Sequence, residues 1–579
     1  MREHPYLSAG AEARALVPNR WDVVAIPLLF LVVFAVFIGV KQASAPIQML
    51  QTTEISLDPW YLPDYALRTT LRMLAGLVCS LLFTLVYGTL AAKSRRLELV
   101  LVPILDVLQS VPVLGYLSFT VTFFLGLFPG SVAGAECAAI FAIFTAQAWN
   151  MTFSFYQSLR TIPADLDEAC RSFRLGAWQR FWRLEVPYAM PGLIWNMMMS
   201  MSGAWFFVVA SEAISVGDKQ ITLPGIGAYV AEALKEKSLA ADGWAIFAMI
   251  IVIMLYDQLM FRPLVAWADK FRMETVSSAM APESWLLDLL QRTRVLKALT
   301  RPVGQVVDLA IHARFAAPRL GARSLWRLAP PERALDYIWF AFLAAVALYA
   351  ARAVVHFVAA SLGWQDFWTV LRLGFYTLAR VVVLIAIASL VWVPLGVMIG
   401  LRPRIAEKVQ PLAQFLAAFP ANLLFPIPVG FIVAYGLNPD IWLTPLMLLG
   451  AQWYIVFNVI AGGTAFPTDF IEASKNFRIR GWLWWRKVML PGIFPYFITG
   501  AITASGGAWN ASIVTEVVNW GDQKLAAHGL GAYIAQMTDA GDYPRIVLGI
   551  VVMSAFVTLF NRLLWRPLYE FSARRMRLN

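Results

Sequence analysis

Long apolar stretches alternate with short polar segments along most of the chain. In the first half they lie at 23–40, 67–91, 98–127, 136–158, 188–214 and 243–262. The second half repeats them at 336–359, 374–400, 410–436, 441–462, 492–518 and 545–565. Each is near the length of about 20 residues that a helix needs to cross a bilayer. The pattern predicts an all-α membrane protein with about 12 transmembrane helices in two homologous six-helix halves. The third span of each half contains Pro112 or Pro420, which favours a broken helix.

The two halves also repeat individual residues. Across most of the chain the spacing is 304 residues, as in the pairs Trp149/Trp453, Phe173/Phe477, Pro187/Pro491, Trp205/Trp509, Glu212/Glu516 and Gly227/Gly531. Nearer the start of each half it is 308, as in Arg72/Arg380 and Gly88/Gly396. The chain is therefore an internal duplication.

Composition and charge agree with a membrane location. Hydrophobic residues make up 59% of the chain, charged residues make up 14%, and the mean hydropathy is +0.64, which does not suit a water-soluble surface. Lysine and arginine gather before the first apolar stretch, after the second and after the fourth, whereas segment 42–66 has neither and carries three carboxylates. The basic segments are expected to be cytoplasmic, together with both termini. Because topology explains the net charge of +11, no nucleic-acid partner is expected.

A charged segment follows the fourth apolar stretch of each half. The first copy runs from Asp167-Glu168-Ala169-Cys170 to Val186-Pro187, and the second from Ile471-Glu472-Ala473-Ser474 to Leu490-Pro491. Glutamate and proline are 19 residues apart in both copies. This pattern resembles the EAA signature of permease subunits of bacterial ABC importers. In that family the segment is a cytoplasmic helix-turn-helix, the coupling helix, which docks in a groove of an ATPase subunit.

The two segments depart from the family pattern at one position. The usual glycine six residues after the glutamate is replaced by Arg174 and Arg478, and we expect Gly176 and Gly481 to provide the turn, because glycine tolerates a positive φ. The expected coupling loops are 160–187 and 464–491. The residues assigned to ATPase coupling are Glu168, Ala169, Arg174, Gly176, Glu472, Ala473, Arg478 and Gly481.

Further motifs narrow the resemblance. Thr70-Leu71-Arg72, the segments ending in Glu212 and Glu516, and the Gly-x-Gly pairs Gly225/Gly227 and Gly529/Gly531 look like the nitrate/sulfonate/taurine (NitT/TauT) permeases, over about residues 60–264 and 368–568. The resemblance implies the MetI-like fold of type I importers, with both subunits of a pair fused in one chain. It also implies two copies of an ABC ATPase subunit, a periplasmic binding protein that delivers a small anion, and a location in the bacterial inner membrane. ATP and magnesium would bind the partner subunits, with no cofactor on this chain.

The expected organisation is a cytoplasmic N-terminus (1–22), a first permease half (23–264), a cytoplasmic linker (265–335), a second permease half (336–568) and a cytoplasmic tail (569–579). The linker is basic and has apolar clusters such as Trp285-Leu286-Leu287. These indicate short helices on the inner leaflet, where anionic lipid attracts basic side chains. The linker either only tethers the halves or also makes a regulatory contact with the ATPase subunits.

No enzyme or metal site is expected in this chain. It has no Gly-x-x-x-x-Gly-Lys-Ser/Thr loop for a nucleotide phosphate, its four histidines are scattered, and its three cysteines show no metal spacing. ATP hydrolysis must then come from separate subunits. One alternative is a secondary transporter with six plus six helices in parallel repeat, which would need no duplicated Glu-Ala loop.

The translocation pathway is expected between the halves, along the helix that follows each coupling loop. Residues at helical spacing on one face are Met198, Met201, Trp205 and Glu212 in the first copy, and Ser505, Trp509, Ser512 and Glu516 in the second. The Met and Trp side chains either pack or contact the ligand. The difference between the two walls predicts a lopsided cavity that suits an organic, sulfonate-like anion.

Charged residues near this pathway have several possible roles. Carboxylates within a membrane usually face a cavity or a partner, and because Glu212 and Glu516 would repel an anion, a structural or gating role is favoured for both. Arg72 and Arg380 lie near the outer ends of their helices. They either snorkel to lipid headgroups or attract an anion.

Overall fold

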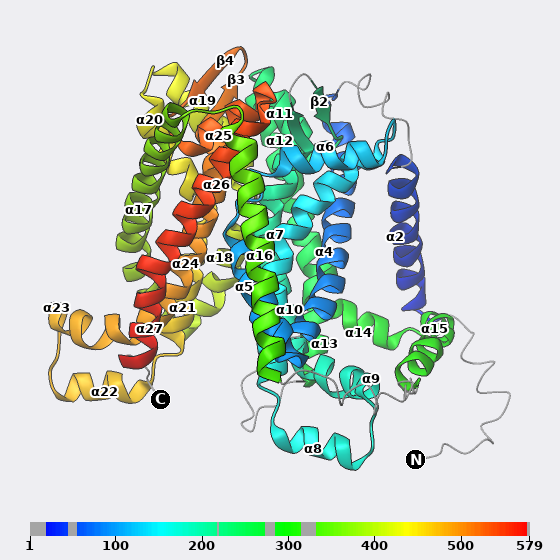
Figure 1. Ribbon diagram of the computed structural model, residues 1–579. Coiled ribbons are helices and arrows are strands. Elements are labelled where there is room, and N and C mark those ends of the chain that lie inside the picture. Colours follow the sequence, from blue (N-terminus) through cyan, green and yellow to red (C-terminus); the bar gives the residue numbers. More distant parts are fainter. Residues whose placement is uncertain (1–18, 44–54, 217–218, 272–283, 314–331, 576–579) are drawn as a thin grey trace.

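The computed structural model describes residues 19–43, 55–216, 219–271, 284–313 and 332–575. Within these ranges the chain is almost entirely helical (Figure 1). The first half contains η1 (Pro59–Tyr61) and helices α2 (Asp22–Ala43), α4 (Leu62–Lys93), α5 (Arg95–Ser110), α6 (Leu117–Leu127), α7 (Ala133–Arg160), α8 (Ala164–Ser172), α9 (Ala177–Arg180), α10 (Val186–Glu212), α11 (Ile226–Lys235) and α12 (Leu239–Tyr256). Between the halves lie α13 (Arg262–Ala268), η4 (Asp269–Phe271), α14 (Trp285–Arg292) and α15 (Val295–His312).

The second half follows the same order. Its helices are α16 (Glu332–Ala359), α17 (Trp364–Gly400), α18 (Pro403–Ala418), η6 (Ala421–Leu424), α19 (Pro426–Ala434), α20 (Pro439–Trp442), η7 (Thr444–Leu448), α21 (Gln452–Thr464), α22 (Thr468–Asn476), α23 (Gly481–Trp484), α24 (Leu490–Thr515), α25 (Leu530–Ala540), α26 (Tyr543–Phe560) and α27 (Arg566–Arg575). Short π-helical turns recur at equivalent places, at η2 (Phe181–Glu185) and η8 (Trp485–Met489), and at η3 (Asp257–Phe261) and η9 (Asn561–Trp565).

All twelve predicted spans fall on helices, but not all of these helices are both long enough and apolar enough to cross a membrane. Among the described residues, seven helices are long and apolar enough to cross a membrane, and the number rises to nine if each of two bent pairs is one span. The predicted spans outside this set are those on α2, α5–α6 and α7. Helix α7 packs against both α4 and α10, so it has less need of an apolar surface toward lipid.

The third span of each half is broken, as its proline predicts. In the first half α5 stops at Ser110 and α6 starts at Leu117, and in the second half the path from α18 to α19 bends by 83°. Each break contacts the other half. The backbone N–H of Val113 donates to Asn510 Oδ1 on α24 (2.8 Å), and Asn422 Nδ2 donates to the Phe206 carbonyl on α10 (3.3 Å). The two halves are therefore joined near their centre by exchanged contacts at equivalent helices.

Close packing inside each half explains one of the repeated glycine pairs. A Cβ at Gly88 would lie 2.8 Å from Phe155, and a Cβ at Gly396 would lie 2.8 Å from Val459. These contacts join α4 to α7 and α17 to α21, which are equivalent helix pairs. The repeated glycine therefore allows close approach of the helices rather than an unusual backbone angle.

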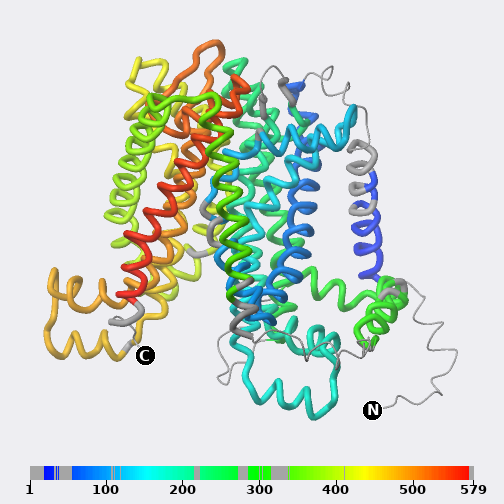
Figure 2. Tube along the Cα trace, viewed as in Figure 1, coloured from blue at the N-terminus to red at the C-terminus, as the bar shows by residue number. Residues whose placement is uncertain are grey.

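Two short hairpins interrupt the expected all-α architecture. Strand β1 (Ala213–Val216) pairs antiparallel with β2 (Lys219–Thr222), and β3 (Val517–Trp520) pairs with β4 (Gln523–Ala526). They start where α10 and α24 end, so these helices stop at Glu212 and Thr515 instead of running to the predicted ends at 214 and 518. Figure 2 shows the hairpins at one end of the molecule, with α8 and α22 at the other end beside both ends of the described chain.

Candidate functional site: coupling loops, central cavity and outer ion networks

The first coupling loop is a helix-turn-helix of α8 and α9. Its turn is at Arg174, which has a φ of 54°, whereas Gly176 has a φ of −67°. Arg478 has a φ of 53° in the second loop and is joined there by Gly481 at 58°. The prediction for Gly176 is therefore wrong, because an arginine adopts the left-handed conformation at the family's usual glycine position in both loops.

The predicted coupling residues lie on exposed loops. Glu168, Ala169 and Glu472 are exposed, and Ala473 is half-buried. Phe173 and Phe477 follow α8 and α22, are each 79% exposed, and had no role predicted from the sequence. A large exposed apolar side chain therefore recurs at the same position of both polar loops. Their recurrence at the spacing of the repeat was the signal that could have identified them.

Different interactions support the two loops. In the first, Arg180 pairs with Asp167 (2.8 Å) and with Glu185 (3.1 Å). In the second, the equivalent residues are Ile471, Trp484 and Met489, which belong to or pack against the hydrophobic core of that half. The same backbone shape is therefore held by ion pairs in one half and by apolar packing in the other.

A cavity of about 90 Å³ lies between the halves. Helix α10 of the first half contributes one wall, and α18, α21, α24 and the η6 and η7 turns contribute the others. The lining is apolar and aromatic, with the hydroxyl groups of Ser202 and Tyr454 as its polar side-chain atoms; it comprises Ser202, Gly203, Phe206, Phe207, Ala417, Phe419, Ala421, Leu446, Met447, Gly450, Ala451, Tyr454, Gly507 and Ala511.

The residues predicted to line the pathway are on a different face of the same helices. Met198, Met201, Trp205, Ser505, Trp509 and Ser512 are all less than 10% exposed and are absent from the lining. Trp205 packs against Tyr256, and Trp509 stacks on Phe556, in each case inside the residue's own half. Met201 Sδ accepts from Gln147 on α7 (3.1 Å), and Met198 Sδ accepts from Gln414 on α18 of the other half (2.8 Å). The predicted residues therefore do not line this cavity. Helical spacing identified a common face that packs against neighbouring helices, and its part in translocation stays a prediction.

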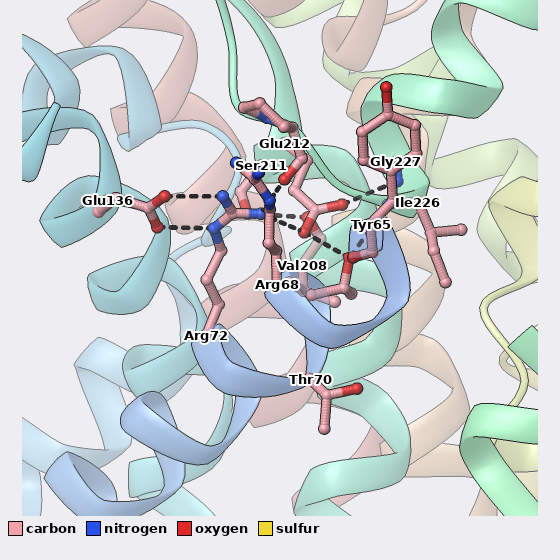
Figure 3. Close-up of polar contacts among 12 residues, drawn as sticks. Tyr65, Arg68, Thr70, Arg72, Glu136, Val208, Ser211, Glu212, Ile226 and Gly227 are labelled. Carbon is pink, nitrogen blue, oxygen red and sulfur yellow. Dashed lines mark hydrogen bonds and ion pairs between the residues drawn. The ribbon is translucent and has the colours of Figure 1, made fainter. Parts of the chain in front are cut away.

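Glu212 is the last residue of α10 and is fully buried (Figure 3). Its Oε1 accepts hydrogen bonds from Thr69 Oγ1 (2.8 Å) and Arg72 Nη1 (2.7 Å), and its Oε2 accepts one from the Gly227 backbone N–H (2.7 Å). These contacts join α4, α10 and α11. A Cβ at Gly225 would lie 2.3 Å from the Glu212 carboxyl carbon, which explains the glycine there.

Arg72 is buried between two carboxylates. Besides Glu212, its guanidinium donates to Glu136 through Nε (2.6 Å) and Nη2 (2.7 Å) and to the Pro224 carbonyl (2.9 Å). Arg72 is 4% exposed. It therefore reaches no headgroup and presents no free charge to an anion, so neither alternative predicted for this arginine holds.

The second half has an equivalent but more open network. Glu516, the C-terminal cap of α24, accepts from Thr377 Oγ1 (2.9 Å), Arg380 Nη1 (3.0 Å) and the Ala532 backbone N–H (3.0 Å). Arg380 also pairs with Asp440 (2.9 Å), so the correction for Arg72 applies to it too. Asp440 in turn contacts exposed His528 (2.9 Å), which has no counterpart in the first half because Pro224 is at that position.

A tyrosine on α11 adds a further contact at the hairpin end of the first half. Tyr229 donates its hydroxyl proton to the Leu57 carbonyl at 2.8 Å. Burial raises the pKa of Tyr229 above its usual value, so the hydroxyl stays protonated. Burial likewise raises the pKa of the equivalent Tyr533 to about 12.

Comparison with known families identifies the duplicated architecture. The model of the family described as "Binding-protein-dependent transport system inner membrane component" matches residues 84–261 and again residues 392–578, more than half of the chain. The chain belongs to this family. Each match contains one coupling loop, so the family member carries two copies of the domain, as the repeat and the MetI-like resemblance predicted. The assignment gives no support to a secondary transporter.

Relatives of this family member are permease proteins of several importers. It is 26% identical over 196 residues to the bicarbonate transport system permease protein CmpB of Synechocystis sp.; the aligned region covers 34% of this chain and 65% of the relative. It is 25% identical over 187 residues to the nitrate import permease protein NrtB of Leptolyngbya laminosa, covering 32% and 63%. It is 30% identical over 210 residues to the glycine betaine/carnitine transport permease protein GbuB of Listeria monocytogenes, covering 35% and 66%. The chain thus spans just under two thirds of the length of each relative.

Proposed function

We propose that this chain is the fused membrane permease of an ATP-driven ABC importer, which moves its substrate by alternating access. The observation that carries the proposal is the pair of coupling loops on one end of the molecule, each with an arginine at positive φ and an aromatic side chain that is 79% exposed. A partner that binds one loop would find a similar surface on the other. Two copies of an ABC ATPase subunit fit this arrangement, and they would supply the ATP and magnesium sites.

The remaining partners follow from the same proposal. The family description names a binding-protein-dependent system, so a periplasmic substrate-binding protein would dock on the end that carries the hairpins and the outer ion networks. The coupling loops would face the cytoplasm of a bacterium, together with both termini, and the spans would cross the inner membrane. Basic residues in the loops and the linker favour this orientation.

The cavity supports a small organic anion, of the sulfonate type, as the substrate. Its lining residues include three phenylalanines and no charged side chain, so it would favour a ligand with an apolar body. Burying such a body contributes roughly 25 cal/mol per Å² of apolar area, whereas a bare inorganic ion gains nothing from these walls. The hydroxyl group of Tyr454 would donate a hydrogen bond to the anionic group, whereas Ser202 Oγ donates its proton to the Met199 carbonyl (2.7 Å). Two relatives are named for the inorganic ions nitrate and bicarbonate, which argues against an organic substrate, so a transport assay must include these two ions.

Charge reversal in both coupling loops tests the proposed function. The double variant Glu168→Lys with Glu472→Lys should keep its fold, because both side chains are exposed, and should lose substrate uptake and its coupling to ATP hydrolysis in reconstituted vesicles. The matched control is Glu407→Lys, at an exposed position of α18 outside both coupling loops and away from the hairpin end, and it should keep both activities. Normal complex assembly and normal uptake in the double variant would contradict the proposal.

Stoichiometry provides an independent check. Since both docking loops are in one polypeptide, native mass measurement of the working complex should find one copy of this chain with two ATPase subunits. Two copies of this chain in the active complex would refute the fused arrangement.

A further inference from the structure

The linker helix α15 contacts the first coupling loop directly. Trp178 Nε1 donates to the Ala310 carbonyl (2.8 Å), and Gln179 Nε2 donates to the His312 carbonyl (3.1 Å). The Arg183 guanidinium also meets the His312 imidazole. The C-terminal turn of α15 is therefore bound to the second arm of the loop, on the side away from α8.

The other end of α15 is bound to the start of α2. The carboxylate of Asp22, which is fully buried, accepts from the backbone N–H groups of Arg294 (3.1 Å), Val295 (3.1 Å) and Leu296 (3.4 Å). This is the N-capping interaction that satisfies the free N–H groups at a helix start. Helix α15 thus connects the first span to the first coupling loop, and Figure 2 shows it below the end of α2.

Between its two attachments, α15 has an amphipathic surface. Val306, Val307 and Leu309 are 69%, 51% and 78% exposed, and by helical spacing they lie on one side. The opposite side carries exposed Lys297 and Arg301. An amphipathic helix with basic residues and an unpartnered apolar side is typical of segments that lie in the membrane interface.

The neighbouring helix α2 indicates which surface covers the apolar side of α15. It too presents large exposed apolar side chains, including Phe30 at 70%, Leu31 at 66% and Phe34 at 64%. Helix α2 is a predicted span, whose exposed side would face lipid, and α15 starts where α2 starts. A bilayer that covers the exposed side of α2 would also reach the apolar side of α15, and the basic residues of α15 would complement anionic headgroups.

The second coupling loop has no equivalent support among the described residues. The residue equivalent to Gln179 is Leu483, which cannot donate a hydrogen bond, and it is 52% exposed where Gln179 is 8% exposed. We propose that α15 lies on the anionic inner leaflet and braces the first coupling loop alone, so that the lipid surface acts on one of the two loops. This difference between the two coupling loops goes beyond the proposed transport function. The two tests below measure fluorescence quenching and thiol labelling rather than transport.

The lipid contact can be tested by fluorescence quenching. The full chain, with its three native cysteines replaced, would carry a dye at Val306→Cys or at the control Asp308→Cys on the opposite side of α15. In phosphatidylglycerol vesicles, lipids with a quencher near the headgroup should quench the dye at 306 strongly and the dye at 308 weakly. Equal quenching, or none at either position, would overturn the lipid contact. Shielding at 306 only after the ATPase subunits are added would identify the ATPase as the partner and also overturn it.

The brace itself can be tested by aqueous labelling of the two loops. A membrane-impermeant maleimide should label Gln179→Cys several-fold more slowly than Leu483→Cys in phosphatidylglycerol vesicles. Val307→Glu on α15, or pure phosphatidylcholine vesicles, should accelerate labelling at 179 and leave 483 unchanged. If 179 reacts as fast as 483 in every vesicle, α15 is not a brace. If Val307→Glu accelerates both positions equally, the asymmetry is wrong.

Discussion

Removing the charge of Glu212 should destabilise the first half by several kcal/mol. The Glu212→Gln side chain has nearly the same volume, so the change tests the interactions rather than the packing. In the native network the two carboxylate oxygens accept three hydrogen bonds, from Thr69, Arg72 and the Gly227 N–H. An amide has only one oxygen. If that oxygen stays with Thr69 and Arg72, the NH₂ group of glutamine faces the N–H of Gly227, and two buried donors oppose each other.

The magnitude follows from these contacts. A buried backbone donor without an acceptor costs about 1–3 kcal/mol, and the two bonds at the remaining oxygen each lose about 1 kcal/mol when the acceptor becomes neutral. Arg72 keeps its two bonds to Glu136, which limits the loss. The expected decrease in the free energy of unfolding is therefore about 3 kcal/mol, at the lower end of the range for breaking a buried ion pair.

The assay is equilibrium unfolding in mixed micelles with increasing sodium dodecyl sulfate, followed by helical circular dichroism. The matched control is Glu232→Gln, which makes the same chemical change in an ion pair with Lys235 (3.0 Å) whose lysine is 72% exposed. This control should lose at most about 0.5 kcal/mol. If the free energy of unfolding of Glu212→Gln matches that of Glu232→Gln, the network does not stabilise the fold.

Three further predictions concern the backbone and the cavity. Gly227→Ala should greatly reduce the yield of monodisperse protein in gel filtration, because its Cβ would lie 2.1 Å from a backbone carbonyl oxygen of α10. Arg174→Gly should raise the free energy of unfolding by up to ~1 kcal/mol, because it relieves a positive φ. Gly176→Ala, at a φ of −67°, should not destabilise the loop through backbone strain. A thermal melt in which Arg174→Gly is less stable than Gly176→Ala would contradict this. In a cysteine-replaced chain, an aqueous thiol reagent should label Phe207→Cys in the cavity faster than Trp205→Cys, which is buried in the core, and the reverse order would show that the cavity has been misplaced.

Local features of the chain were predictable where they depend on residues close in sequence. All twelve apolar stretches fell on helices, Pro112 and Pro420 marked the break in the third span of each half, and the Glu-Ala segments became helix-turn-helices. The turn of the first loop was predicted incorrectly at Gly176, because the surrounding helices hold Arg174 in a conformation that its own preference disfavours, whereas Gly481 in the second loop has the positive φ that was predicted. The hairpins were missed because they lie at the ends of apolar stretches and contain only four residues per strand.

In the candidate site, too, the sequence identified individual residues but not the contacts between residues far apart in the chain. Glu212 and Arg72 stood out as charges in apolar segments, but nothing in their spacing shows that they bond to each other, because 140 residues separate them. The residues predicted to line the pathway lie on helices that border the cavity, but on faces that do not line it. Helical periodicity groups residues that share a face, but only the positions of the neighbouring helices decide whether that face meets a core or a cavity.

The sequence by itself determined that this protein is a duplicated, helical membrane protein with a Glu-Ala helix-turn-helix loop in each half, because hydrophobic length, repeat spacing and motif order are properties of the chain read along one dimension. Tertiary structure alone decided which charges pair, which helix face lines the cavity and that α15 contacts the first loop. Those outcomes depend on contacts between residues far apart in the chain. In each case the free energy comes from burial and hydrogen bonding that exist only once the helices have packed.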